Sequence, residues 1–318
     1  MHARDSTHPL SGAGSLAIGC PLAGSLLATL ALLLSGCGVG ASPGPGGAVR
    51  VVAAENFWGS IASQLGGTRT SVQSIIVNPA QDPHAYEPTP ADARTLALAQ
   101  LTIVNGVGYD PWAPKLLAAD SAARRVALDV GGLLALGQGK NSHRWYDPTD
   151  VELVASAITA DLTKLDPKDE RYFAQRHALF ERLGLARYHA LIARIKARYA
   201  GVPVGASESI FAPLAPALGL RLVTPPSFMN AISEGTEVTA QDAGTAQRQI
   251  TGHEIKVWLY NTQNATPEVQ RLNALARGAR IPIATVTETL SPPTDSFEQW
   301  QVAQLRGLAL ALHEATGR

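Results

Sequence analysis

Four side chains that can bind a divalent cation stand at the ends of short apolar, β-branched runs or follow them: His84, His143, Glu208 and Glu288. The runs in question span residues 71–77, 124–130, 202–208 and 281–288. If they form parallel strands, their carboxyl ends share one edge of a sheet, where open α/β sheets bind ligands. Two imidazoles and two carboxylates form a four-ligand set suited to Zn²⁺ or Mn²⁺. Each residue alone is as well explained as a hydrogen-bonded loop residue, so the expected metal site rests on their joint placement.

The first of these histidines lies in a stiff loop. In the segment QDPHAYEPTP (81–90), Pro83, Pro88 and Pro90 each fix φ, and a proline also disfavours helical backbone in the residue before it. A helix therefore cannot run through this segment. Such a loop presents the His84 imidazole in a preset direction, so less entropy is lost when a metal binds. The alternative is an ordinary surface histidine, which needs no function.

The polar residues around these candidates have simpler interpretations. We expect Tyr86 and Glu87 either to pack the loop or to orient the histidine ring from behind. The segment GHEIK (252–256) lacks a second histidine at the spacing of a zinc-protease helix. No motif for a general base accompanies the four candidates. The sequence therefore favours metal binding without catalysis.

Eight short apolar runs alternate with helical patterns, which predicts an α/β fold with parallel strands covered on both faces. The runs span residues 49–55, 71–77, 101–106, 124–130, 202–208, 221–225, 254–261 and 281–288. Helices are expected at residues 57–65, 90–100, 110–119, 147–167, 209–219, 240–250, 266–278 and about 295–315. We therefore predict two lobes, each with a mostly parallel four-stranded sheet flanked by helices.

A long helical stretch separates the two halves. Residues 168–200 contain one glycine, Gly184, and no proline. A continuous helix of about 30 residues would extend about 45 Å, which is longer than a small domain is wide. We predict one rigid connector helix between an N-terminal metal-binding lobe (49–167) and a C-terminal metal-binding lobe (201–318). Such a helix predicts only a small hinge motion, and a break at Gly184 would weaken that expectation.

The N-terminal region predicts export. Its apolar run (22–37) is too short for a permanent membrane span and has the length of a signal-peptide core. The run ends in LSGC, which resembles the bacterial lipobox. We therefore expect a lipoprotein signal peptide over residues 1–36, lipidation at Cys37 and a flexible tether over residues 37–48. An ordinary secretory signal with a chance cysteine is the alternative.

Composition narrows the classes of partner. Hydrophobic residues make up 46% of the chain, which is enough for one or two domains without a disulfide, and the only other cysteine, Cys20, lies within the predicted signal. The formal net charge is +0, so nothing favours a nucleic acid. We expect a monomer.

Four motifs resemble the landmarks of the metal-binding solute-binding lipoproteins of bacterial zinc/manganese ABC importers. They are DPHAYEPTPAD (82–92), HRWYDP (143–148), SES (207–209) and VTETL (286–290). The resemblance covers nearly the whole mature chain and implies that His84, His143 and Glu208 are metal ligands. The fourth ligand in that family is most often an aspartate near the last strand, where this chain has Glu288. Asp295 is the alternative for that position.

The resemblance implies capture and delivery. A lipid-anchored protein on the outer face of the cytoplasmic membrane would hold Zn²⁺ or Mn²⁺ between its lobes and pass it to an ABC permease powered by an ATPase. The two carboxylates favour the harder ions Mn²⁺ or Fe²⁺, whereas the Irving–Williams order favours Zn²⁺. Other functions stay open: a secreted metal-dependent hydrolase, a surface adhesin lipoprotein, or a binder of an organic solute in a roomy cleft.

Overall fold

The computed structural model describes residues 47–80, 82–119 and 125–318, which fall in one compact unit. The predicted signal peptide (1–36), Cys37 and all but the last two residues of the predicted tether (37–48) lie outside the described residues. Among the described helices, none combines the length and the apolar character needed to cross a membrane.

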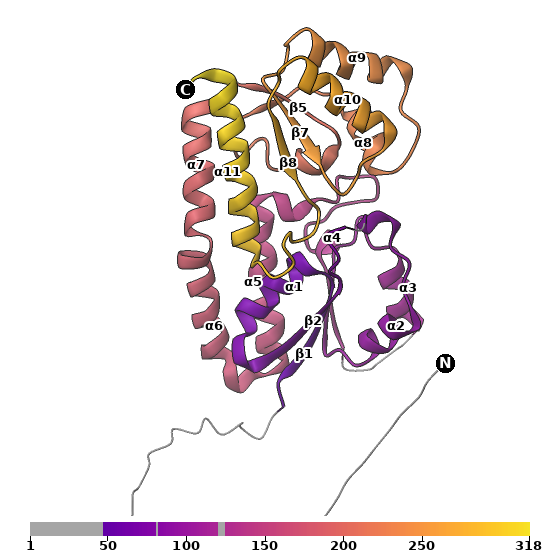
Figure 1. The fold of residues 1–318 in the computed structure, drawn as a ribbon. Helices are drawn as coiled ribbons and strands as arrows, with labels where there is room; N and C mark the ends of the chain where they lie inside the picture. The colour runs from indigo at the N-terminus through magenta and orange to yellow at the C-terminus, as the bar shows by residue number, and fades with distance from the viewer. Residues whose placement is uncertain (1–46, 81, 120–124) are drawn as a thin grey trace, which may run out of the picture. The chain divides into compact units, whose positions relative to one another are not determined.

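Two parallel sheets of four strands each organise the described residues (Figure 1). The first contains β1 (Val49–Glu55), β2 (Thr70–Ile76), β3 (Leu101–Val104) and β4 (Val126–Asp129), in the order β2-β1-β3-β4. The second contains β5 (Pro203–Ala206), β6 (Arg221–Leu222), β7 (Val257–Asn261) and β8 (Ile283–Val286), in the order β6-β5-β7-β8. Every pairing is parallel, so each lobe presents its strand ends at one edge. The predicted fold class is confirmed.

Helices flank both sheets. In the first lobe they are α1 (Asn56–Gly66), α2 (Pro90–Ala97), α3 (Trp112–Ala119), α4 (Val130–Leu133) and α5 (Pro148–Leu165). The second lobe contains α8 (Pro226–Ser233), α9 (Ala240–Thr251), α10 (Pro267–Gly278) and α11 (Phe297–Thr316). Local sequence explains several starts, since Thr89 and Ser296 form capping boxes and Thr239 and Thr266 cap with their side chains.

One predicted helix is wrong. Residues 209–219 form a short 3₁₀ turn (Ser209–Phe211) followed by further turns. Pro213 and Pro216 lie within this stretch, and each removes a backbone donor that an α-helix requires. Helix α8 was not predicted from the sequence, although Pro226 occupies the first helical turn, a position that proline favours.

The connector is not one uninterrupted helix. A 3₁₀ turn (Pro167–Asp169) leads into α6 (Glu170–Leu179), a π-helical turn (Phe180–Gly184) and then α7 (Ala186–Tyr199). The Leu185 amide donates to the Phe180 carbonyl at 2.8 Å, which closes the wider turn. The prediction of a continuous helix over 168–200 is therefore corrected at the segment that contains its only glycine.

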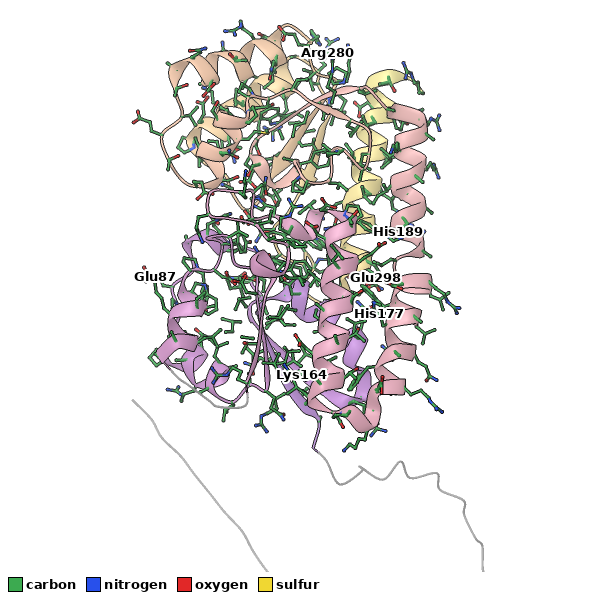
Figure 2. The ribbon with its side chains drawn as sticks, turned by 180° about the vertical axis from the view of Figure 1, so that it is seen from behind. Glu87, Lys164, His177, His189, Arg280 and Glu298 are labelled. Atoms are coloured by element: carbon green, nitrogen blue, oxygen red, sulfur yellow. The ribbon has the colours of Figure 1, made fainter. Side chains whose placement is uncertain are left out.

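The last helix adds a second link between the lobes. It runs beside α7, and its first turn contacts α1 of the N-terminal lobe (Figure 1). The Phe297 amide donates to Ser60 Oγ at 2.9 Å, and Gln64 Nε2 donates to Glu298 Oε2 at 2.9 Å. Glu298 is labelled in Figure 2. The C-terminal lobe is thus held to the N-terminal lobe by α11 as well as by the connector.

Phe297→Ala should lower the free energy of unfolding by about 3–5 kcal/mol, as is typical of a buried phenylalanine. The side chain is fully buried and packs against Tyr188 and Trp300, with ring centroids 6.3 and 6.0 Å away. Urea unfolding followed by circular dichroism measures this effect. The matched control is Leu310→Ala on the same helix, whose side chain is 70% exposed and should change stability by less than about 0.5 kcal/mol. Equal effects of the two substitutions would contradict this role of α11.

Candidate metal centre

The backbone of the first loop holds His84 in place. Pro83, His84 and Ala85 form a 3₁₀ turn, and Asp82 caps it by accepting the His84 amide at 2.9 Å on Oδ1. The segment that contains these prolines thus forms a short, capped turn after β2 and not a flexible loop. The His84 side chain is 16% exposed, so its ring lies largely inside the protein.

The second histidine is oriented by Asn141. The Asn141 side-chain oxygen accepts the His143 backbone amide at 2.9 Å and lies 3.0 Å from His143 Nδ1. The Nδ1 atom therefore carries the proton of the neutral ring, which leaves the Nε2 lone pair free to bind a metal. Only 1% of this side chain is exposed, and Trp145 packs edge-on against the ring with centroids 5.2 Å apart.

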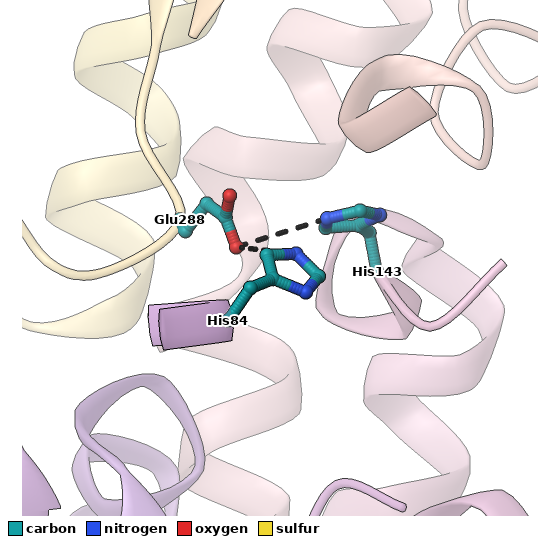
Figure 3. Close-up of side chains that lie close together, drawn as sticks. All are labelled: His84, His143 and Glu288. Atoms are coloured by element: carbon teal, nitrogen blue, oxygen red, sulfur yellow. Dashed lines mark ion pairs between the residues drawn. The ribbon is translucent and has the colours of Figure 1, made fainter. Parts of the chain in front are cut away.

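Glu288 brings the two histidines together from the other lobe. Its Oε2 atom lies 3.4 Å from His84 Nε2 and 3.7 Å from His143 Nε2 (Figure 3). Potential donor atoms of the three residues all lie within 4.8 Å of one another. Both Nε2 atoms are buried and have no hydrogen-bond partner among the described residues. Two unpartnered imidazole nitrogens facing one carboxylate oxygen fit a divalent cation.

Glu208 lies nearby but outside this group of three. Its side chain is fully buried, and Asn261 Nδ2 and Asn264 Nδ2 donate to its two oxygens, each at 2.8 Å. Asn261 Nδ2 also donates to Glu288 Oε1 at 2.9 Å, so one amide holds both carboxylates. In this arrangement Glu208 is an adjacent carboxylate, and its role as a ligand stays a prediction.

The other three candidates lie elsewhere. Tyr86 donates its hydroxyl to Asp92 at 2.8 Å and packs on Trp112, so it stabilises the start of α2. Glu87 is exposed and points outward in Figure 2. Asp295, the alternative fourth ligand, is half-buried in the loop before α11 and is not part of the group of three.

Two residues of the site were missed by the sequence analysis. Tyr109 donates its hydroxyl to Glu288 Oε2 at 2.6 Å, and Asn261 joins the two glutamates. Asn261 is the last residue of β7, at the strand end that usually carries ligand-binding residues, and that placement was a usable signal. Tyr109 lies in a loop between β3 and α3, and nothing in its local sequence indicated its partner 179 residues away.

Burial and charge set the protonation of the group. Burial alone would lower the pKa of His84, but the negative charge of nearby Glu288, with that of Asp82, raises it to about 9. Burial lowers the pKa of His143, so its ring stays neutral at pH 7. The nearby histidines hold the pKa of Glu288 below its usual range despite burial, so this carboxylate stays ionised.

Glu208 behaves in the opposite way. Burial, followed by the negative charge of Glu288, raises its pKa to about 8. Without a metal it is therefore mostly neutral at pH 7, while Glu288 carries the negative charge of the pair. A bound cation would favour ionisation of both carboxylates.

The chain is similar to known metal-binding proteins. The family model for "zinc-uptake complex component A periplasmic" matches residues 51–311. A manganese-binding lipoprotein, MntA of Halalkalibacterium halodurans, is 30% identical over 165 residues, which are 50% of this chain and 54% of that protein. The chain thus spans about half the length of the curated relatives it matches.

Solved structures share the fold. A crystal structure of ZnuA superimposes with a TM-score of 0.67 at 21% identity, over 84% of this chain and 99% of the other. A manganese-bound periplasmic metal-binding protein from Candidatus Liberibacter asiaticus gives a TM-score of 0.69 at 18% identity, over 83% of this chain and 99% of the other. At these identities the likeness concerns the fold alone.

Proposed function

Because this chain belongs to the family of the periplasmic component A of zinc-uptake complexes, we propose that it captures a divalent cation, Zn²⁺ or Mn²⁺, for an ABC importer. The observation that carries the proposal is that the buried Nε2 atoms of His84 and His143 lie beside Glu288 Oε2 without a hydrogen-bond partner among the residues that the structure describes. A buried polar atom without a partner costs about 1–3 kcal/mol. A metal bound there would offset that cost for both imidazoles.

The four proposed ligands come from both lobes. His84 and His143 follow β2 and β4 of the first sheet, and Glu208 and Glu288 follow β5 and β8 of the second. Glu208 would complete the set when it ionises and one of its oxygens turns from its asparagine partner. A cation held in this way ties the two lobes together, and release to a permease would require them to separate.

Delivery would depend on further partners. We propose that Cys37 is lipidated, so that the protein stays at the outer face of the cytoplasmic membrane as a monomer, close to a permease and its ATPase. The relatives support this setting, since MntA is named a lipoprotein and PsaA of Streptococcus pneumoniae is named a substrate-binding lipoprotein of a manganese ABC transporter.

A hydrolase is a weaker interpretation of the same residues. The family is one of transport components, which favours a transported ion over a catalytic one. Three donors without Glu208 would, however, leave an open coordination position of the kind that catalytic zinc sites keep. Hydrolysis of an ester or peptide panel that disappears with EDTA would favour the enzyme.

Calorimetric titration of the chelator-stripped protein with Zn²⁺ and with Mn²⁺ tests the proposal. We expect one ion per chain, and we expect Glu288→Gln to weaken binding strongly because it removes the charge that faces both imidazoles. His177→Ala on the connector is the control, since His177 pairs with Glu181 instead of with the metal group. If neither ion binds stoichiometrically, the capture function is wrong and an organic ligand becomes the better hypothesis.

A further inference from the structure

Tyr109 touches every member of the group of three. Its hydroxyl donates to Glu288 Oε2 at 2.6 Å, and its ring packs edge-on against His84 with centroids 4.7 Å apart. The His143 ring lies 6.0 Å away, again edge-on. Only 2% of Tyr109 is exposed. Burial and the charge of Glu288 hold the pKa of Tyr109 well above its usual value, so the phenol remains a donor at neutral pH.

The loop that carries Tyr109 is fixed by its neighbour. Asp110 accepts the backbone amides of Asn105 at 2.7 Å and Gly106 at 2.8 Å, and the Tyr109 amide donates to the Gly106 carbonyl at 3.0 Å. These bonds close a tight turn directly after β3. The phenol therefore reaches Glu288 from a rigid support in the opposite lobe.

The two carboxylate oxygens of Glu288 have different partners. Oε2 accepts from Tyr109 and faces the two imidazoles, whereas Oε1 accepts from Asn261 Nδ2 at 2.9 Å. Asn261 is itself held, because its Oδ1 accepts the Gln263 amide at 3.0 Å and its Nδ2 also donates to Glu208. For Oε1 to turn toward a metal beside Oε2, the carboxylate would have to break the bond from Asn261.

The distances around Oε2 fit a low coordination number. Donor atoms about 2.0–2.1 Å from a tetrahedral metal lie about 3.3 Å from one another, whereas right-angled donors at the same bond lengths lie about 2.9 Å apart. The observed separations from the two Nε2 atoms are 3.4 and 3.7 Å. Both separations exceed the right-angled value and lie nearer to the tetrahedral one, with one oxygen from Glu288.

We propose that Tyr109 and Asn261 restrict Glu288 to one-oxygen coordination, and that this restriction makes the site prefer Zn²⁺ over Mn²⁺. The inference rests on the proposed capture function and specifies its ion. Manganese favours six oxygen-rich ligands, which here would need both oxygens of a glutamate. Zinc in closed protein sites is satisfied by four donors. Tyr109 thus acts as a positioning residue for selectivity.

Tyr109→Phe tests the proposal, because it keeps the ring against both histidines and removes only the hydroxyl. Without that bond one of the two hydrogen bonds that restrict the carboxylate is lost, so a rotation that offers both oxygens has only the Asn261 bond to break. We expect the ratio of the Mn²⁺ and Zn²⁺ dissociation constants to fall by roughly tenfold or more, a change of the size that a lost hydrogen bond to a charged group produces. Chelator competition at pH 7 measures both constants.

The coordination number itself gives a second readout. Four-coordinate Co²⁺ absorbs visible light much more strongly than five- or six-coordinate Co²⁺. Wild-type protein loaded with Co²⁺ should show the strong four-coordinate bands, and Tyr109→Phe should weaken them. Tyr172→Phe is the matched control, since that hydroxyl bonds to Thr68 away from the metal group. It should leave both the selectivity and the spectrum unchanged.

The outcomes separate this inference from the function on which it rests. Wild-type protein that binds no ion would overturn the capture function. Wild-type protein that binds Co²⁺ with weak, high-coordination bands, or Tyr109→Phe with wild-type selectivity and spectrum, would overturn the restriction while leaving capture intact. If Tyr109→Phe does not fold, Asn261→Ser frees the other oxygen and should shift selectivity in the same direction, and no shift there would also overturn it.

Discussion

Replacing His143 by alanine should abolish tight zinc binding while the protein stays folded. The ring contributes one of the two unpartnered Nε2 atoms beside Glu288 and is already oriented by Asn141. Losing an outer partner of a metal ligand typically costs about 10–100-fold in affinity, so losing a donor atom itself should cost more than roughly 100-fold. His84→Ala should have a similar effect, because its Nε2 lies on the other side of the same oxygen.

The measurement is zinc affinity by competition with a chromogenic chelator, with thermal unfolding of the metal-free proteins alongside. The control is His189→Ala. His189 lies on the connector, and its imidazole pairs with Glu152 of α5 instead of with the metal group. This variant should bind zinc as the wild type does. If His143→Ala retained wild-type affinity, the metal would have to bind elsewhere, and the three-residue group would not be the centre of the site.

Zinc binding at pH 7 should release protons, and their number should reveal whether Glu208 is a ligand. With its pKa raised to about 9, His84 is protonated in the metal-free protein at pH 7 and must lose that proton before its Nε2 atom can bind zinc. Glu208, with its pKa raised to about 8, is also mostly protonated. A site made of the two histidines and Glu288 should therefore release about one proton, and a site that includes Glu208 about two.

The sign of the pH dependence follows from the same values. Protons compete with the metal at every pH below the raised pKa of His84, so affinity should increase as the pH rises toward 9. Below that range, release of one proton corresponds to about a tenfold gain per pH unit, and release of two to about a hundredfold gain. Titrations from pH 6 to 8 in buffers of different ionisation enthalpy count the protons directly. A binding constant that does not change with pH would refute the charged state of His84.

Glu208→Gln separates the two stoichiometries. A glutamine cannot ionise, so the second proton should vanish if Glu208 is a ligand, and zinc affinity should fall with it. If proton release is already near one in the wild type, the substitution should change neither quantity. In that case the asparagines would hold Glu208 away from the ion in the bound protein as well.

The features that the sequence predicted well have local causes. Alternating apolar runs and helical patterns indicated two parallel sheets. The spacing of apolar residues in each strand and helix reflects which of its faces is buried. Three prolines around His84 identified a stiff loop because proline restricts φ wherever it stands. One failure was also local in origin. The apolar character of residues 209–219 suggested a helix, although two prolines within the segment forbid one.

The local sequence did not predict the conformation of the connector. Its composition is helical throughout, yet a π turn at Phe180–Gly184 divides it. The helix propensity of a residue hardly distinguishes an α-helical from a π-helical hydrogen bond. The packing around the segment therefore decides which of the two forms. The contact of α11 with both lobes was equally hidden, because it depends on Phe297 and Glu298 meeting α1 across more than 230 residues of chain.

The sequence by itself determined which residue types could bind a metal and at which strand ends they lie. The local patterns of strands and helices indicate the order of these elements along the chain and hence the direction of each strand. Only the tertiary structure decided which atoms meet. It placed His84, His143 and Glu288 around one point, bound Glu208 to two asparagines, and brought Tyr109 from the other lobe onto Glu288. Those choices depend on how the two lobes pack against each other, and the residues adjacent to a hydrogen bond across the lobes do not indicate its partner.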